Sequence, residues 1–260
     1  MQEHVSQESQ SNDCYPEARE PGHGAACRLG FWSAILTGAS ALAALGIAVT
    51  TAPARSGPFC LTEECIDYPY TDAAAFVPND YYWMYPAFLM GPLLVLLVAS
   101  VHHSLPLHRR LYSHVALLFA AISAAALSVN YFIQLTVVQP SFLKGEVEGL
   151  TLLSQYNPHG LFIALEDIGY LMMGVAFLFT GLALLSRTGI ERALRRLLIA
   201  AAVLAIGSLP VLALIYGYDL EYRYEVAVLL IDWLTLIVTG VLFGVHFCRV
   251  SHQPYDRGQP

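Results

Sequence analysis

Residues 130–167 read NYFIQLTVVQPSFLKGEVEGLTLLSQYNPHGLFIALED, which is the end of one apolar segment, a loop and the start of the next apolar segment. Both apolar arms carry polar residues that hydrocarbon disfavours. Asn130 and Gln134 precede the loop, and Glu166 and Asp167 follow it. The stretch therefore predicts two membrane helices that bring polar groups to the same side of the membrane.

The composition extends this prediction to the whole chain. Its 260 residues are 56% hydrophobic and only 13% charged, with a mean hydropathy of +0.54. Soluble proteins carry about 25% charged residues, and apolar runs of about 17–25 residues predict transmembrane helices. Six such runs occur, at residues 31–49, 85–101, 115–138, 161–185, 194–216 and 226–248. The predicted fold is all-α, a six-helix transmembrane bundle within residues 29–250.

The distribution of Lys and Arg predicts the orientation of the bundle. Cytoplasmic loops retain basic residues, and a cytoplasmic amino terminus puts all but Arg55, Lys144 and Arg223 of the 13 Lys and Arg residues inside. Both termini are therefore predicted to be cytoplasmic, in a multi-pass protein of the cell membrane. Residues 1–28 are rich in Gln, Ser, Glu, Pro and Gly and are predicted to be a disordered tail, and residues 251–260 a short second tail.

The first outer loop contains two features of its own. Cys60 and Cys65 are separated by four residues, and an oxidising compartment would permit a disulfide between them. We expect this loop to cap the outer face of the bundle. It ends in residues 80–86, DYYWMYP, which are typical of an aromatic belt at the membrane interface and alternatively of a ligand-stacking wall.

Three predicted helices carry polar groups at similar depth. At about 1.5 Å per residue, Asn130, Glu166 and Asp232 lie roughly 8–12 Å below the outer ends of their segments. Residues spaced by four or seven share a helix face, whereas Asp167 points about 100° away from Glu166. The predicted ligand-binding residues are Asn130, Gln134, His159, Glu166, Asp167, Tyr170 and Asp232.

Two interpretations of these residues stay open. In the first, they line an outward-facing polar pocket for a small ligand, a lipid headgroup or a cation. In the second, they form a polar network that fastens helices in a structural or accessory subunit of a membrane complex. The acidic outer loops, including Asp219, Glu221 and Glu225 in the last loop, are either a solvated surface or a field that attracts cations.

Other classes of function find less support in the sequence. The net charge of −7 and the lack of a basic stripe argue against nucleic-acid binding. The Gly-x-Ser-Gly motif of intramembrane serine proteases does not occur, and neither does the His-x-x-x-His ligand pair of zinc hydrolases. We therefore favour a non-enzymatic protein without assigning a cofactor. Four histidines lie at similar inner depth and are either ordinary interface residues or axial haem or metal ligands: His102, His103, His114 and His246.

The expected partners are first of all the lipids of the bilayer. A GxxxG motif at residues 240–244 is typical of close helix packing and leaves a homo-oligomer or a larger membrane complex open. The runs NYFIQ at 130–134, VQP at 138–140 and QYNPHG at 155–160 resemble those of uncharacterised prokaryotic integral membrane proteins. This resemblance implies a multi-pass membrane protein and brings no activity with it.

Overall fold

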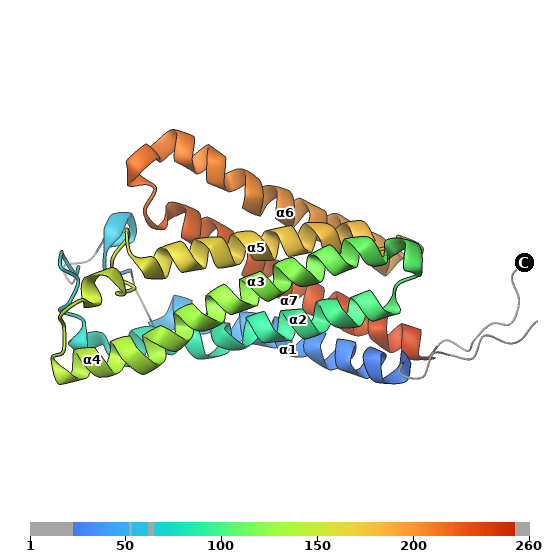
Figure 1. The fold of residues 1–260 in the computed structure, drawn as a ribbon, viewed down its shortest axis with the longest axis horizontal. Coiled ribbons are helices and arrows are strands. Elements are labelled where there is room, and N and C mark those ends of the chain that lie inside the picture. Colours follow the sequence, from blue (N-terminus) through green and yellow to red (C-terminus); the bar gives the residue numbers. More distant parts are fainter. Residues whose placement is uncertain (1–22, 52–53, 62–64, 253–260) are drawn as a thin grey trace, which may run out of the picture.

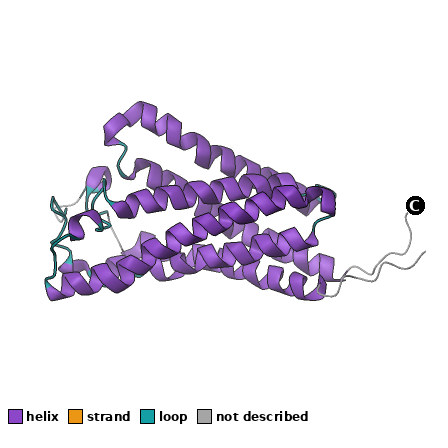
Figure 2. Cartoon of the chain, in the orientation of Figure 1, coloured by secondary structure: helices purple, strands orange, loops and turns teal. Residues whose placement is uncertain are grey.

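The computed structural model describes residues 23–51, 54–61 and 65–252. The predicted disorder of residues 1–22, and the tail from residue 253 onward, lie outside the described residues. Within them the chain forms helices and no strand (Figures 1 and 2). The α-helices are α1 (His23–Thr51), α2 (Met84–Ser104), α3 (Arg110–Ile133), α4 (Gln139–Lys144), α5 (Leu161–Ala183), α6 (Gly189–Tyr216) and α7 (Tyr222–His252).

Six helical segments of the described chain are long and apolar enough to cross a membrane. They are α1, α2, α5, α6, α7 and one continuous segment that runs from α3 through a π-helix (Gln134–Val138) into α4. This confirms the predicted all-α bundle of a multi-pass membrane protein. Figure 1 places the start of α1 and the end of α7 at the same end of the bundle.

Several helices extend beyond the apolar runs that predicted them. Residues 23–28, assigned from the sequence to the tail, form the first turns of α1. The third spanning helix continues to Lys144 and ends because the next residue, Gly145, adopts φ +71. Glycine adopts this left-handed conformation without a Cβ clash, and it commonly ends helices. α7 begins at Tyr222, so Glu225 belongs to a helix and not to a loop.

The GxxxG motif packs within the chain. A Cβ atom on Gly240 would lie 2.7 Å from the carbonyl oxygen of Ala34 and 2.9 Å from the Cα of Gly38, both on α1. Contacts this short with backbone atoms leave no room for a side chain. The motif therefore serves the α1–α7 interface of a single molecule.

Two groups of loops cover the end of the bundle that lies opposite the start of α1 and the end of α7. We call them the cap: described residues 54–83 between α1 and α2, and residues 145–160 between α4 and α5. Short 3-10 helices punctuate the cap, at Gly57–Phe59, Ala74–Phe76, Asn79–Tyr81 and Leu150–Leu152. Two further ones lie in other connections, at Leu107–Arg109 and Gly217–Asp219. On the cap side, α6 leans away from the bundle (Figure 1), and none of its residues 206–216 is buried.

Candidate functional site

The cap is fastened to α7 through Ser56. Its hydroxyl donates to the carbonyl oxygen of Tyr156 at 2.5 Å and lies 2.7 Å from the hydroxyl oxygen of Tyr222. The next residue, Gly57, has φ +65, and a Cβ there would come within 2.6 Å of the Tyr222 ring. Cys60 and Cys65 form the predicted disulfide, with sulfur atoms 2.01 Å apart. The two loops of the cap and the start of α7 are thus held together.

A cavity of about 250 Å³ lies beneath the cap. Its wall combines aromatic rings with two carboxyl groups, those of Asp80 and Glu225. The lining residues are Ala48, Ala54, Arg55, Ser56, Phe59, Asp80, Trp83, Gln155, Tyr156, Tyr222, Glu225, Val226, Leu229 and Trp233. Trp83, from residues 80–86, is therefore part of the cavity wall.

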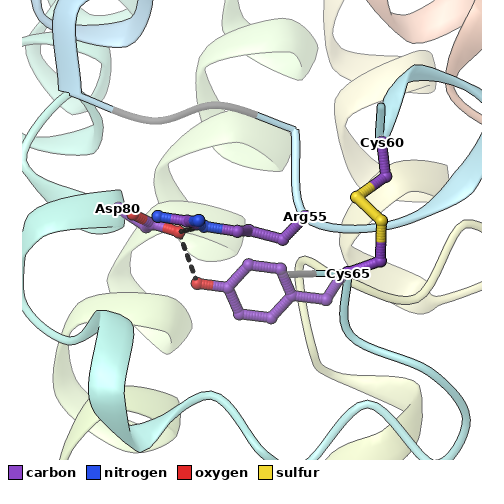
Figure 3. Close-up of polar contacts among 5 residues, drawn as sticks. Arg55, Cys60, Cys65 and Asp80 are labelled. Atoms are coloured by element: carbon purple, nitrogen blue, oxygen red, sulfur yellow. Dashed lines mark hydrogen bonds and ion pairs between the residues drawn. A yellow bond between two sulfur atoms is a disulfide. The ribbon is translucent and has the colours of Figure 1, made fainter. Parts of the chain in front are cut away.

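Asp80 forms an ion pair with an arginine of the cap. Arg55 donates from Nε to Asp80 Oδ2 at 3.2 Å, and its guanidinium stacks 4.0 Å from the centre of the Phe76 ring. Figure 3 shows Arg55 alongside Asp80, with the Cys60–Cys65 bridge nearby in the cap. The Tyr156 hydroxyl donates to the same oxygen at 3.1 Å. Burial, followed by the neighbouring Tyr81 and Asp80, raises the pKa of Tyr156, so its phenol stays protonated and can donate.

Glu225 lacks such a basic partner. It is 9% exposed, and no Lys, Arg or His among the described residues forms a salt bridge with it. The nearest arginine in sequence, Arg223, instead pairs with Glu221 at 3.3 Å and stacks on Tyr216. Among the residues that the structure describes, no basic side chain thus pairs with this cavity carboxyl group.

A chain of hydrogen bonds runs behind the cavity wall. Trp233 Nε1 donates to the Tyr170 hydroxyl at 2.9 Å, and the hydroxyl oxygens of Tyr170 and Tyr131 are 2.7 Å apart. Tyr131 donates to Glu166 Oε1 at 2.6 Å. An indole N–H only donates and a phenol has one proton, so Tyr170 must donate to Tyr131. Every proton in the chain therefore points toward Glu166.

The end of this chain returns to the cavity. Glu166 is completely buried, and its Oε2 accepts no hydrogen bond from a donor in the described part of the protein. Its carboxyl group lies close enough to that of Glu225 to interact with it electrostatically. The hydrogen bonds thus run from Trp233, a cavity residue, through Tyr170 and Tyr131 to Glu166.

The other predicted residues lie elsewhere. Asn130 Nδ2 donates to the carbonyl oxygen of Phe162 at 2.9 Å, and Gln134 Nε2 donates to that of Leu153 at 2.6 Å. These bonds tie α3 and the π-helix to α5 and to the cap, and neither side chain lines the cavity. His159 lines a separate groove on the cap together with Tyr68, Tyr70 and Asn157.

The remaining two acids also stay outside the cavity. Asp167 is half-buried and interacts electrostatically with Glu225. Asp232 is completely buried, and neither of its oxygens has a hydrogen-bond partner within the described chain. It lies close enough to Tyr170 and Tyr224 to interact with them electrostatically.

The inner histidines do not gather at one point. The rings of His102 and His114 are 5.9 Å apart, and His102 Nδ1 lies 2.8 Å from the Ser113 hydroxyl. His103 is exposed, while His246 interacts with Glu191 on α6. Within residues 23–51, 54–61 and 65–252, no group of three or more His, Cys, Asp or Glu is arranged to hold a metal ion.

Sequence reasoning placed Glu225 among the acids of the last loop and did not assign Glu225, Trp233 or Tyr131 to the site. The available signal was the spacing of Tyr222, Glu225, Leu229 and Trp233, which recur every three or four residues and so share one helix face. Comparison with protein-family models, curated proteins and solved structures found no match for the chain. The geometry of the cavity is therefore the basis for a functional assignment.

Proposed function

We propose that this protein binds a small organic cation, a ligand with an ammonium group, in the cavity beneath the cap. The observation that carries the proposal is Glu225, a carboxyl group that forms no salt bridge with a basic residue of the described chain and lies in a wall rich in aromatic rings. A cation supplies the charge that this site lacks. The cavity volume of about 250 Å³ suits a ligand of a few heavy atoms.

The aromatic wall favours an ammonium group over a metal ion. Cations bind to the faces of Trp and Tyr rings, with about 0.5–1 kcal/mol at exposed sites and about 2 kcal/mol when desolvated. Trp83 and Trp233 lie 5.9 Å apart with their planes tilted by 51°, and Tyr156 and Tyr222 complete this wall. A calcium ion needs about 6–8 oxygen ligands, whereas one of the two carboxyl groups here is engaged with Arg55.

We further propose that the cavity faces the outside of the cell. Support comes from the basic residues of the described chain, most of which lie in the connections and helix ends at the opposite end of the bundle. The disulfide lies in the cap, and disulfides persist in oxidising compartments. The ligand would then be captured from the external medium or from the outer leaflet.

The test is isothermal titration calorimetry of the purified protein in maltoside micelles, with tetramethylammonium as the probe. Glu225→Gln removes the charge, and Glu221→Gln is the matched control because it removes an equal charge from the same helix end outside the cavity. We expect Glu225→Gln to weaken binding by about tenfold or more, which is about 1.4 kcal/mol. Equal affinities of the two variants would contradict the proposal.

Two further arms define the ligand. The neutral compound 3,3-dimethylbutan-1-ol has the shape of choline without its charge, and we expect it to produce no binding heat. Competition by a short-chain phosphatidylcholine would identify a lipid headgroup as the occupant, and its absence would favour a free cation.

A structural or accessory role is the second candidate. Asn130 and Gln134 support it, because both fasten separate segments through backbone carbonyl groups. This role predicts that the protein co-purifies with a larger partner. It also predicts that substitutions of Glu225 change the stability of the protein and leave the binding of tetramethylammonium undetectable or unchanged.

A further inference from the structure

Two polar atoms in the cavity wall have no hydrogen-bond partner in the described chain. Asp80 is 3% exposed, and Arg55 and Tyr156 both donate to its Oδ2. Its other oxygen, Oδ1, is buried and accepts no hydrogen bond from the residues that the structure describes. The side-chain nitrogen of Gln155, Nε2, is likewise buried and donates to no acceptor among them. Asp80 and Gln155 both line the cavity that contains Glu225.

One of these atoms requires a donor and the other an acceptor. A carboxylate oxygen only accepts hydrogen bonds and an amide nitrogen only donates them, and leaving either group buried without a partner is costly. A hydroxyl group supplies both partners from one oxygen atom, because it donates its proton and accepts at its lone pairs. A tetramethylammonium ion satisfies neither atom, since it has no N–H, no O–H and no lone pair.

We propose that the ligand of the cavity is an amino alcohol, a cation that carries a hydroxyl group beside its ammonium group. This inference rests on the proposed function, in which Glu225 and the aromatic wall bind the ammonium group. The hydroxyl group then donates to Asp80 Oδ1 and accepts from Gln155 Nε2. Choline, in which a short carbon chain joins a trimethylammonium group to a hydroxyl group, is the simplest probe with both features.

The wall around these two atoms is fixed by its own hydrogen bonds. The Ser56 hydroxyl donates to the carbonyl oxygen of Tyr156, and the Tyr222 hydroxyl donates to that of Gln155 at 3.1 Å. The Tyr156 hydroxyl in turn donates to Asp80 at 3.1 Å. The backbone of residues 155 and 156 and the Asp80 carboxyl group are thus positioned before a ligand enters, which lowers the entropic cost of binding.

The same two atoms argue against an ester or a carboxylate in place of the hydroxyl group. An ester oxygen, as in the phosphodiester of a lipid headgroup, has no proton to donate to Asp80. A carboxylate, as in glycine betaine, would bring a second negative charge to Asp80, which already forms an ion pair with Arg55, and like charges side by side are costly. A free alcohol is therefore favoured over a lipid headgroup and over a zwitterion.

The experiment is isothermal titration calorimetry of the wild-type protein in maltoside micelles with choline, choline methyl ether and tetramethylammonium. The ether keeps the charge and the acceptor oxygen but has lost the proton of the hydroxyl group. We expect choline to bind about tenfold more tightly than tetramethylammonium, and the ether to lose most of this advantage.

The outcomes separate this inference from the proposed function. Equal affinities for choline and tetramethylammonium would overturn the amino alcohol and leave the cation site intact, and a water molecule bound to Asp80 and Gln155 would give this result. Tighter binding of glycine betaine than of choline would also overturn it. No binding of any of these cations would overturn both.

A variant tests the contact between the hydroxyl group and Gln155. Gln155→Leu removes the donor at similar size, so it should weaken choline binding by about threefold or more and leave tetramethylammonium binding unchanged. Gln139→Leu is the matched control, because Gln139 Nε2 also has no partner in the described chain but lies on α4, outside the cavity. Its affinities should equal those of the wild-type protein. An equal loss of affinity for choline and tetramethylammonium in the Gln155→Leu protein would contradict the hydroxyl contact.

Discussion

Replacement of Tyr131 by Phe probes the hydrogen-bond chain behind the cavity. The variant loses one hydroxyl and with it two hydrogen bonds, to Glu166 at 2.6 Å and with Tyr170 at 2.7 Å. Polar side-chain bonds between membrane helices contribute about 0.6 kcal/mol on average and up to about 1.7 kcal/mol. Because Tyr131 is completely buried, water would not replace the lost partners. We therefore expect a loss of about 2 kcal/mol in the free energy of unfolding.

Thermal unfolding in detergent micelles measures this loss. For a chain of this size, about 2 kcal/mol corresponds to a Tm lowered by roughly 4–8 °C. Tyr85→Phe is the matched control, since Tyr85 is 55% exposed and its substitution should leave the Tm nearly unchanged. A Tyr131→Phe protein as stable as the Tyr85→Phe protein would refute the chain as a stabilising element.

Two further substitutions test the packing of the bundle. Gly240→Ala should lower the free energy of unfolding by about 1–3 kcal/mol through overpacking, because the new methyl group meets the backbone of α1. Gly46→Ala is the control and should keep or raise the Tm, because there is open space at that position. Equal effects of the two substitutions would show that α1 and α7 do not pack closely at Gly240. Asp232→Leu should raise the Tm, because the wild-type protein buries a carboxyl group that has no hydrogen-bond partner in the described chain, and such burial is costly. A large decrease in the Tm would instead indicate a partner that binds Asp232.

The bundle itself could be predicted because lipid imposes a simple rule. Each span must satisfy its own backbone groups in hydrocarbon, so length and hydropathy are enough to locate the six segments. The Cys60–Cys65 disulfide could also be predicted, because the two cysteines are separated by only four residues and lie in the same outer loop. The shared face of Glu166 and Tyr170 followed from their spacing along one helix.

The site was only partly predictable, because depth along a helix does not determine direction around the bundle. Asn130 and Asp232 lie at a depth similar to that of Glu166 within their helices, but Asn130 bonds a backbone carbonyl and Asp232 is not part of the cavity wall. Glu225 was placed in a loop because the apolar run begins after it, whereas α7 starts at Tyr222. Helices continue through polar residues at their ends, which the apolar pattern does not mark. For this reason Glu225, at the polar start of α7, was not assigned to the site.

Fluorescence of the cavity tryptophans tests the central claim most directly. The chain has three tryptophans, and only Trp83 and Trp233 line the cavity, while Trp32 is exposed on α1. In a Trp32→Phe protein the emission therefore reports on the cavity alone. Titration with tetramethylammonium should produce a saturable change in emission, and 3,3-dimethylbutan-1-ol should produce none. An unchanged emission, or an equal response to the neutral compound, would contradict a cation site beneath the cap.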